Sequence, residues 1–352
     1  MKETAVLIVG QGLAGTWLSW WLFKMGIPFK LIDLPDPDCA SRRAAGVVNP
    51  VTGRRIVTTW MIEQLLPFAS ASYGEIGSFL ENSFYKETSV IDFFPSVQML
   101  QAFQKRYEED PAWLVPGRDP EKYTEWFSYE LGWGSIQPCL LVYVEKLLTA
   151  WRSWLGKSGF LIESVFDISK LRKKEIGIEY ADMGARYIIF CDGRSSAENP
   201  YFEKLPFALN KGEGMLVEIK NLPGGLIFKK GMSLVPFREN VFWLGSSYEW
   251  SFPDDRPSQK FRNNAESWLQ HFMKVPYTIL EQFASIRPAT LERRPFVGFH
   301  PLHPQIGILN GMGTKGCSLA PYFAKQLAEK IAGGGNILPL ADIARFEKIL
   351  GK

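Results

Sequence analysis

The sequence predicts an α/β protein in which a doubly wound parallel-sheet domain is interleaved with an α+β domain built on an antiparallel sheet. Three observations predict this fold class. A β-favouring apolar run at residues 5–9 leads through a glycine loop into an apolar helix. Short segments with a period of about two, separated by Gly, Pro and Asn, fill residues 212–250. A further strand, glycine loop and helix follow at residues 306–332.

The composition narrows the class of protein. The chain has 352 residues, enough for about two domains, and its 46% hydrophobic and 22% charged residues are an ordinary globular balance. The net charge of +3 comes without a long basic run, which argues against a nucleic-acid partner. Four scattered cysteines and three histidines argue against disulfides and metal sites. With no leader-like start and no apolar stretch of about 18 residues, we expect a cytoplasmic protein without a membrane span.

The first glycine loop, GQGLAG at residues 10–15, lies between the strand at 5–9 and a helix expected over 13–25. Gly10, Gly12 and Gly15 permit a tight turn, close approach of the backbone to a pyrophosphate, and close packing of the helix on the strand. Leu13 and Ala14 open the helix, whose free N–H groups favour phosphate oxygens. The loop is therefore typical of a dinucleotide site.

A second strand at residues 29–32 ends on Asp33, which Leu34 follows. Asp33 lies 18 residues beyond Gly15, where an acid binds the hydroxyls of an adenosine ribose. An acid rather than an arginine there disfavours the 2′-phosphate of NADP. The unit predicts a Rossmann-like dinucleotide site and leaves NAD and FAD both open.

The segment after Asp33 favours FAD. An NAD dehydrogenase would continue with further strand–helix units, but this chain continues with the loop SRRAAG at residues 41–46. Its small residues let the backbone approach a flat ring, and Ser41, Arg42 and Arg43 can donate to phosphate, ribityl or ring oxygens. Later, an apolar strand ends on Asp192 and Gly193, which is typical of a return to the nucleotide sheet beside the ligand crevice.

The remaining segments define two interleaved domains. We expect helices at residues 60–80, 137–159 and 258–285, the last in two pieces, and a mixed region at 84–135. Strands are expected at 160–168, 175–180 and 185–190. We assign residues 1–83, 136–205 and 291–352 to the nucleotide domain, and residues 84–135 and 206–290 to the substrate domain.

Six motifs occur in an informative order. They are VLIVGQGLAG at 6–15 with LID at 31–33, SRRAAGVVNP at 41–50, IIFCDG at 188–193, LVPFRENVFWLGSSYE at 234–249, IRPATLERRPFVG at 286–298 and GMGTKGCSLAP at 311–321. Together they resemble the superfamily of D-amino-acid oxidase, glycine oxidase and sarcosine oxidase, which are FAD-dependent amine oxidoreductases. The chain is most similar in texture to glycine oxidase and to the oxidase half of the bifunctional enzyme that matures wobble methylaminomethyl-uridine in tRNA. Residues 84–135 match nothing familiar and are expected to carry substrate identity.

The resemblance implies a glycine-oxidase-like fold with FAD bound non-covalently, because no equivalent of the linking cysteine of some relatives can be placed. Residues 165 and 166 would offer backbone groups to the adenine, and residues 192 and 193 would lie beside the pyrophosphate. The residues expected around FAD are Gly10, Gly12, Leu13, Ala14, Gly15, Asp33, Leu34, Ser41, Arg42, Arg43, Ala45, Gly46, Val165, Phe166, Cys191, Asp192, Gly193, Gly311, Met312, Gly313, Thr314, Lys315 and Gly316.

The resemblance also implies the substrate site. The arginine of the family's Arg-Pro motif grips a substrate carboxylate, and here it is Arg287; a planar, bidentate guanidinium suits a carboxylate. Tyr248 is expected to present a hydroxyl to the substrate, and Lys315 to add positive charge at the pyrimidine edge of the flavin. One departure from the family is Glu292 to Pro295, where relatives commonly carry an Asp before the second proline.

The second glycine loop, at residues 311–316, shares the spacing of the first. Only 36 residues follow Gly316, and they contain a helix but no strand that ends on an acid. A second dinucleotide unit would therefore be incomplete. We expect this loop to hold the other end of the same FAD.

The expected activity is hydride transfer from a C–H bond beside an amine nitrogen to flavin N5, with oxygen or another acceptor taking the electrons. The substrate would be a small amine or amino acid. The alternatives are an oxidase resembling the tRNA-wobble-uridine enzyme, a flavoprotein acting on a 2-hydroxy acid or a sulfur metabolite, and a flavin-binding protein without activity. An NAD dehydrogenase is the least favoured enzyme class, and the oligomeric state is left open.

Overall fold

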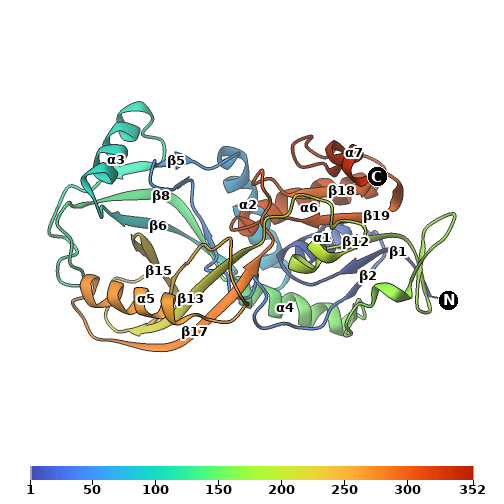
Figure 1. The fold of residues 1–352 in the computed structure, drawn as a ribbon, viewed down its shortest axis with the longest axis horizontal. Helices are drawn as coiled ribbons and strands as arrows, with labels where there is room; N and C mark the ends of the chain where they lie inside the picture. Colours follow the sequence, from blue (N-terminus) through green and yellow to red (C-terminus); the bar gives the residue numbers. More distant parts are fainter. Residues whose placement is uncertain (1, 352) are drawn as a thin grey trace.

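Two sheets organise the chain, and each forms the centre of one lobe (Figure 1). The computed structural model describes residues 2–351. Both termini lie on the lobe that contains the first strand (Figure 1). The first sheet has eight strands and the second has nine, and a separate two-stranded ribbon pairs β4 (Val51–Thr52) with β5 (Val57–Thr58).

The first sheet is parallel at its centre, as the sequence predicts. β1 (Lys2–Val9) lies between β2 (Phe29–Ile32) and β12 (Met183–Phe190), and all three run in the same direction. β9 (Leu161–Ile162) extends the parallel part beyond β2, and β19 (His303–Asn310) extends it beyond β12. The antiparallel additions are β10 (Leu171–Lys173), β11 (Ile178–Tyr180) and β18 (Phe296–His300). The carboxyl ends of the parallel strands share one edge, where α/β sheets bind ligands.

Aromatic residues account for the thick core on one face of this sheet. α1 (Leu13–Lys24) is buried along most of its length and packs against α6 (Gly316–Ile331), α2 (Ile62–Phe79) and α4 (Val144–Lys157). Trp20 of α1 meets Trp151 of α4 edge to face, with ring centroids 5.6 Å apart. The core on the opposite face includes residues of η3 (Ile343–Phe346) and α7 (Glu347–Leu350), together with Phe202 and Leu205. The other short helices of the chain are η1 (Ile168–Lys170) and η2 (Gly193–Glu198).

The second sheet is mainly antiparallel, and its meander confirms the period-two prediction for residues 212–250. Five of its strands come from residues 210–287: β13 (Asn210–Ile219), β14 (Ile227–Lys230), β15 (Met232–Arg238), β16 (Val241–Gly245) and, at the edge, β17 (Tyr277–Arg287). It is completed by β3 (Val47–Val48), β6 (Tyr85–Phe93), β7 (Leu114–Pro116) and β8 (Trp133–Val142). α3 (Val97–Glu109) and α5 (Gln259–Phe272) belong to the same lobe (Figure 1).

Two helix predictions are wrong in part. Residues 278–285, expected as a second helical piece, lie within β17, which pairs with β13 from Arg287 to Tyr277. This run contains Thr, Ile and Phe and alternates in burial at its start, so pairing with a long neighbouring strand decides its structure. Residues 137–142, expected within a helix, belong to β8, and the helix α4 begins only at Val144.

The assigned domain boundaries stay a prediction, and two segments pair differently from that assignment. The boundary at residue 136 lies inside β8, so residues 136–142 pair within the second sheet. β3, at residues 47 and 48, also pairs with β8 rather than with the first sheet. The chain therefore enters the second sheet just after the SRRAAG loop. This loop connects the two lobes.

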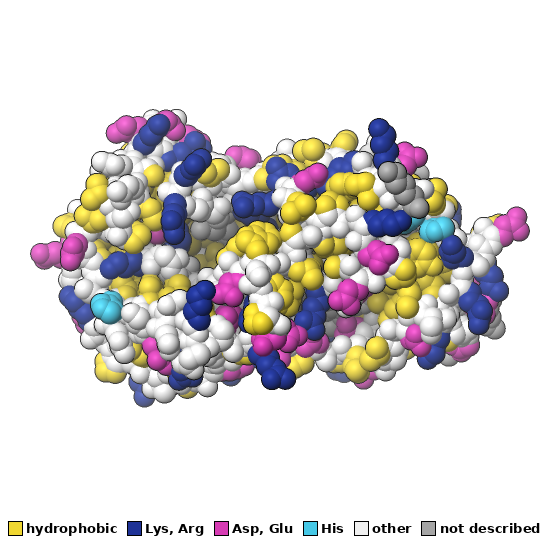
Figure 2. Space-filling model, viewed as in Figure 1, with side chains coloured by type: hydrophobic (Ala, Val, Ile, Leu, Met, Phe, Trp, Pro, Cys, Tyr) yellow, Lys and Arg dark blue, Asp and Glu magenta, His cyan; other side chains and the backbone are white. Residues whose placement is uncertain are grey.

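The surface in view shows basic and acidic side chains interspersed, with no concentrated basic area on that face (Figure 2). Within residues 2–351, no helix has the length and apolar character that crossing a membrane requires.

Candidate active site

A cavity of about 1130 Å³ lies between the two sheets, at the carboxyl ends of β1, β2 and β12. Its lining comes from both lobes, since Gly10 and Asp33 belong to the first and Trp243 and Arg287 to the second. The volume exceeds the roughly 300–1,000 Å³ typical of pockets for drug-sized ligands. The cavity can therefore take a ligand larger than a single metabolite.

Backbone contacts explain two glycines of the first loop. Gly10 has a φ of 96°, and a Cβ atom there would lie 2.6 Å from the carbonyl oxygen of Cys191. A Cβ atom on Gly15 would lie 1.9 Å from the carbonyl oxygen of Gly10. Gly12, Leu13 and neighbouring Ala14 line the cavity at the start of α1, whereas Gly15 lies beneath it. The loop thus brings bare backbone and a helix N-terminus to the cavity, as a pyrophosphate requires.

Asp33 is held against this loop. Its Oδ1 accepts a hydrogen bond of 2.8 Å from the backbone N–H of Gln11, and its Oδ2 lies 2.6 Å from Nη1 of Arg152. Asp33 and Leu34 both line the cavity. The carboxylate therefore stands beside the glycine loop, where the sequence predicts a ribose, with Arg152 of α4 as an unpredicted neighbour.

The loop at residues 41–46 is fastened on both sides. Ser41 Oγ accepts from the backbone N–H of Leu13 at 3.1 Å. Arg43 donates to Asp38 and, at 2.7 Å, to Glu281 of β17, and its guanidinium lies 4.9 Å from the centre of the Phe283 ring. The two acids raise the pKa of Arg43 against the opposing effect of burial. The charge of Arg43 is thus already matched by protein acids, so this residue links the two lobes.

The rest of this loop also faces the cavity. Arg42, Ala45 and Gly46 line it, and Gly46 has a φ of 78°. A Cβ atom on Gly46 would lie 1.9 Å from the carbonyl oxygen of Val142. This close approach requires glycine at the point where the chain passes into the second sheet.

Asp192 lies at the end of β12 in a polar cluster. Ser196 Oγ donates to Asp192 Oδ1, and Asn310 Nδ2 donates to the carbonyl oxygen of Gly193 and to Ser196 Oγ, both at 2.8 Å. Burial raises the pKa of Asp192 to about 6. The cavity lining here also includes Val165, Phe166, Cys191 and Gly193.

The second glycine loop reaches the same cavity. Its lining residues are Met312, Gly313, Thr314 and Gly316. A Cβ atom on Gly316 would lie 3.1 Å from Cδ1 of Leu13, so α1 and α6 begin next to each other. Both glycine loops therefore border one continuous space, which supports a single ligand held at two ends.

Within the described residues 2–351, four predicted site residues do not line this cavity: Gly15 of the first loop, Gly311 and Lys315 of the second, and Tyr248. Gly311 has a φ of 76° and packs closely against Thr290, so it serves the turn. Lys315 Nζ donates to Thr59 Oγ1 at 3.0 Å, and burial, with Arg293 and Arg294 nearby, lowers the pKa of Lys315 to about 8.

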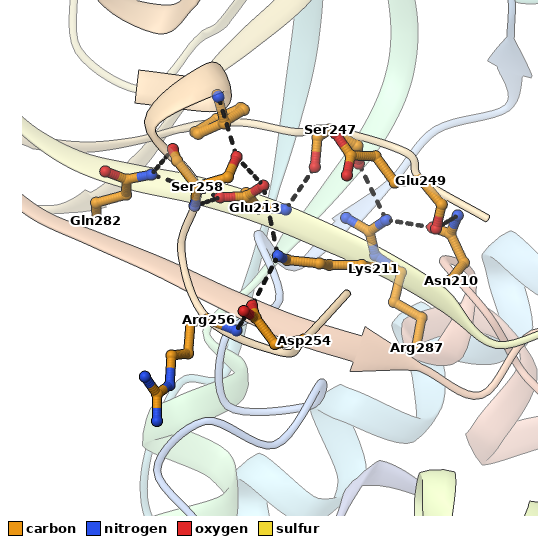
Figure 3. A network of polar contacts seen from close by, with 11 residues as sticks. Asn210, Lys211, Glu213, Ser247, Glu249, Asp254, Arg256, Ser258, Gln282 and Arg287 are labelled. Carbon is orange, nitrogen blue, oxygen red and sulfur yellow. Dashed lines mark hydrogen bonds and ion pairs between the residues drawn. The ribbon is translucent and has the colours of Figure 1, made fainter. Parts of the chain in front are cut away.

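Arg287 is where the sequence predicts a carboxylate anchor. It ends β17, lines the cavity and is partly buried. Nη1 donates to Asn210 Oδ1 at 2.8 Å and to the carbonyl oxygen of Ser247 at 3.2 Å (Figure 3). Nη2 donates to Ser246 Oγ at 2.9 Å. Burial lowers the pKa of Arg287. Among residues 2–351, no carboxylate oxygen lies within 4.0 Å of its guanidinium nitrogens.

Tyr248, by contrast, does not line the cavity. Its side chain is 47% exposed, and its ring centre is 5.8 Å from the Arg287 guanidinium. The hydroxyl that contacts Arg287 belongs to Ser246, which the sequence reasoning missed. A signal was present, because Ser246 directly follows the strand that ends at Gly245 and precedes Tyr248 by two positions.

Comparison with known proteins decides the family. The family model described as "DAO: FAD dependent oxidoreductase" matches residues 5–330. The chain belongs to this family. FAD is accordingly its cofactor, and the chain is an FAD-dependent oxidoreductase.

Solved structures of DAO-family fold agree over nearly the whole chain. Glycine oxidase from Geobacillus kaustophilus superposes with a TM-score of 0.81 at 19% identity, covering 97% of this chain and 98% of that one. L-proline dehydrogenase from P. horikoshii gives 0.75 at 15% identity, covering 99% and 98%. Iminodiacetate oxidase from Chelativorans sp. BNC1 gives 0.74 at 19% identity, covering 95% and 97%. At these identities the likeness shows the fold, which confirms the glycine-oxidase-like prediction.

The residues present fit FAD. The close backbone approaches at Gly10 and Gly15 leave room for nothing larger than glycine, and the cavity extends from Asp33 past the first loop to Arg287. On this chain, the loop at residues 10–14 would hold the pyrophosphate and Asp33 the ribose. Residues 41–46 and 312–316, apart from Lys315, would border the remainder of the cofactor.

Proposed function

We propose that this DAO-family oxidoreductase oxidises a small amine or amino acid whose carboxylate binds Arg287. The observation that carries the proposal is the set of partners around this side chain. All the hydrogen bonds of its guanidinium in the described part of the chain go to neutral oxygens, those of Asn210, Ser246 and Ser247. A partly buried cation with only neutral partners favours an anionic ligand.

The surroundings of Arg287 support a carboxylate in particular. The neutral partners hold both Nη1 and Nη2 and so fix the orientation of the guanidinium, which lowers the entropic cost of binding a planar anion. Gly212 lies directly beneath it, because a Cβ atom there would be 1.9 Å from Nη2. The three solved relatives named above carry in their names glycine, L-proline and iminodiacetate, each of which joins an amine nitrogen to a carboxylate.

The chemistry divides between cofactor and chain. Bound FAD supplies the acceptor for a hydride, and the protein supplies orientation and electrostatics. Arg287 holds the carboxylate, which turns the neighbouring C–H bond toward the cofactor end of the cavity. The histidines at positions 271, 300 and 303 do not line the cavity, so among the described residues no imidazole stands ready as a base. A substrate that binds as the neutral amine needs none.

The same arginine would also hold a 2-hydroxy acid, which is the second candidate that this geometry favours. Both substrate classes share the carboxylate and a C–H bond beside it. They differ in whether nitrogen or oxygen is attached to the reacting carbon. A panel that contains both classes therefore separates them directly.

The test is anaerobic mixing of the purified holoprotein with glycine, sarcosine, L-proline, lactate and glycolate, following loss of flavin colour. Bleaching by an amine substrate but not by its 2-hydroxy counterpart supports the proposal, and the reverse pattern supports the hydroxy-acid alternative. Arg287→Leu should raise the KM of a carboxylate substrate about 10–100-fold, since a hydrogen bond to a charged group contributes about 1.5–3 kcal/mol. An unchanged KM rejects the role of Arg287.

A further inference from the structure

A loop at residues 246–257 covers part of the site and is tied down at both ends. It leaves β16 and leads to α5, and its cavity-lining residues are Ser246 at the start and Asp255, Arg256 and Pro257 at the end. Both ends contact the same stretch of β13, residues 210–213 (Figure 3). This stretch can therefore control the position of the whole loop.

The start of the loop is fixed by backbone contacts to Lys211 and Glu213. The N–H of Glu213 donates to Ser247 Oγ at 2.9 Å, and the N–H of Ser247 donates to the carbonyl oxygen of Glu213 at 3.2 Å. Lys211 and Glu249 exchange backbone hydrogen bonds of 2.9 and 3.0 Å. Because Ser246 and Ser247 accept hydrogen bonds from Arg287, this end of the loop orients the guanidinium.

The end of the loop is fixed by the Glu213 carboxylate. It accepts from the N–H of Ser258 at 2.5 Å, from Ser258 Oγ at 2.7 Å and from Gln282 Nε2 at 3.4 Å. Ser258 in turn caps α5, since its Oγ accepts from the N–H of Phe261 at 3.1 Å. Gln282 lines the cavity, so the carboxylate joins the helix, the loop and the cavity wall.

Charge explains why the two side chains act together. Lys211 is 2% exposed and Glu213 is 0% exposed, and Nζ of Lys211 lies 3.9 Å from Glu213 Oε1 and 3.8 Å from Asp254 Oδ1. A buried charge that loses its partner is strongly destabilising, whereas removing both charges can be nearly neutral. Asp254 belongs to the loop, so the ammonium also draws the part of the loop next to Asp255 toward β13 (Figure 3).

Neither side chain lines the cavity. Successive side chains of a strand point to opposite faces. Gly212, between them, lines the cavity beneath Arg287, so Lys211 and Glu213 project from the other face of β13. Any effect of these residues on the reaction must therefore pass through the groups that they contact, which are the loop and Gln282.

We propose that Lys211 and Glu213 are positioning residues, which hold loop 246–257 and through it the arrangement of Arg287, Ser246 and Ser247 that receives the substrate carboxylate. The part that concerns the carboxylate rests on the proposed function of Arg287. The part that concerns the loop stands on the contacts of β13. Loss of the pair is expected to weaken carboxylate binding without altering the cofactor end of the cavity.

The chain offers a matched control in a second buried ion pair of the same sheet. Lys229 Nζ lies 2.7 Å from Asp92 Oδ2, Asp92 is 0% exposed, and the pair joins β14 to β6. Neither residue lines the cavity. Asp92→Asn therefore removes a buried charge of the same kind at a distance from loop 246–257.

The experiment compares wild type, Glu213→Gln, Lys211→Met, the double variant and Asp92→Asn, all as holoprotein. Hydrogen exchange of peptides covering residues 246–258 reports the loop, and calorimetric titration with acetate and benzoate, each set against its amide, reports the carboxylate site. We expect both single variants to accelerate exchange in 246–258 and to raise the Kd for benzoate about tenfold. The double variant should change the exchange rate and the Kd by less than the two single variants added together, because it leaves no buried charge without its partner. Asp92→Asn should alter neither measurement.

The outcomes separate the two proposals. Unchanged hydrogen exchange at residues 246–258 in Glu213→Gln and Lys211→Met overturns the positioning role, whether or not the Kd for benzoate changes. Faster exchange with an unaltered benzoate Kd overturns its link to the carboxylate. If wild type binds neither carboxylate better than its amide, the proposed function of Arg287 fails, and the exchange comparison with Asp92→Asn still decides whether the pair holds the loop.

Discussion

The two glycine loops of this protein share one spacing but differ in what surrounds them. The first, at residues 10–15, is followed by α1, by β2 and by Asp33, whose carboxylate accepts a hydrogen bond from the loop itself. The second, at residues 311–316, is followed by α6, and after it the structure has no further strand up to residue 351. The glycine spacing alone therefore does not distinguish a loop that begins a dinucleotide-binding unit from a loop that borders the other end of the same nucleotide.

The glycines themselves differ in the same way. In the first loop, Cβ atoms on Gly10 and Gly15 would collide with backbone, at 2.6 and 1.9 Å. In the second, a Cβ atom on Gly316 would meet only the flexible end of Leu13, at 3.1 Å. The difference holds at the third glycine, where the first loop touches backbone and the second has more room, whereas Gly311 of the second loop is packed closely against Thr290.

The largest expected effect concerns the third glycine of each loop, Gly15 and Gly316, which we replace by alanine in turn. Gly15→Ala places a methyl group against the carbonyl of Gly10, and we expect a loss of about 3 kcal/mol in the free energy of unfolding together with loss of bound FAD. Thermal unfolding and the flavin content of the purified protein measure both. Gly316→Ala is the matched control and should keep FAD and most of its stability; equal effects from the two variants would contradict the difference between the loops.

The next prediction concerns the acid that only the first loop possesses. Asp33→Asn leaves Arg152 without one of its two acids and weakens the acceptor for Gln11 and the ribose, so we expect FAD affinity to fall about tenfold. Titration of apoprotein with FAD, followed by flavin fluorescence, measures it. Glu163→Gln removes the other acid that contacts Arg152. The side chain of Glu163 is 64% exposed, so this variant should leave the FAD affinity unaltered. Equal losses in both variants would assign the effect to Arg152 alone.

The smallest effect concerns Asp192, which stands between the loops. Its pKa is raised from 3.8 to about 6, so between about pH 4 and 6 the folded chain keeps a proton that the unfolded chain has lost. Stability from this group is thus present below pH 4 and is lost as the pH rises through 6. Asp192→Asn should remove this loss and gain stability over wild type at pH 7; the rise of the pKa from 3.8 to about 6 sets an upper limit of about 3 kcal/mol, from which the weaker hydrogen bonds of an amide subtract. Denaturant unfolding of apoprotein at pH 4 and pH 7 measures it; a variant that is less stable at both values contradicts the assignment.

Much of the first sheet could be predicted because its signals are local. The apolar run before Gly10, the acid at Asp33 and the strand ending at Asp192 each follow from neighbouring residues, and all of them line the cavity or lie beneath it. Residues 278–285 were predicted as a helix because local propensity is weak there, and pairing with β13, distant in sequence, decides that they form a strand.

The site residues that were missed depend on contacts between segments. Ser246 contacts Arg287 only because β16 and β17 both pair with β13, and Arg152 reaches Asp33 from α4, far along the chain. Lys315, whose role at the flavin stays a prediction, shows how a side chain can lie away from the expected direction. Its place in the glycine loop predicts a charge facing the cofactor, but its long side chain turns to Thr59 and lies beside Arg293 and Arg294. Side-chain direction in a loop is set by such neighbours, which the local sequence does not contain.

The central claim is that both glycine loops border one site for one FAD, and cofactor stoichiometry tests it most directly. The purified protein should be yellow and should release one FAD per chain on denaturation, with no flavin left on the polypeptide. In Gly15→Ala this FAD should be lost, while Gly316→Ala should retain it. Two nucleotides per chain, a nicotinamide nucleotide in place of FAD, or a colourless protein that takes up no FAD would contradict the claim.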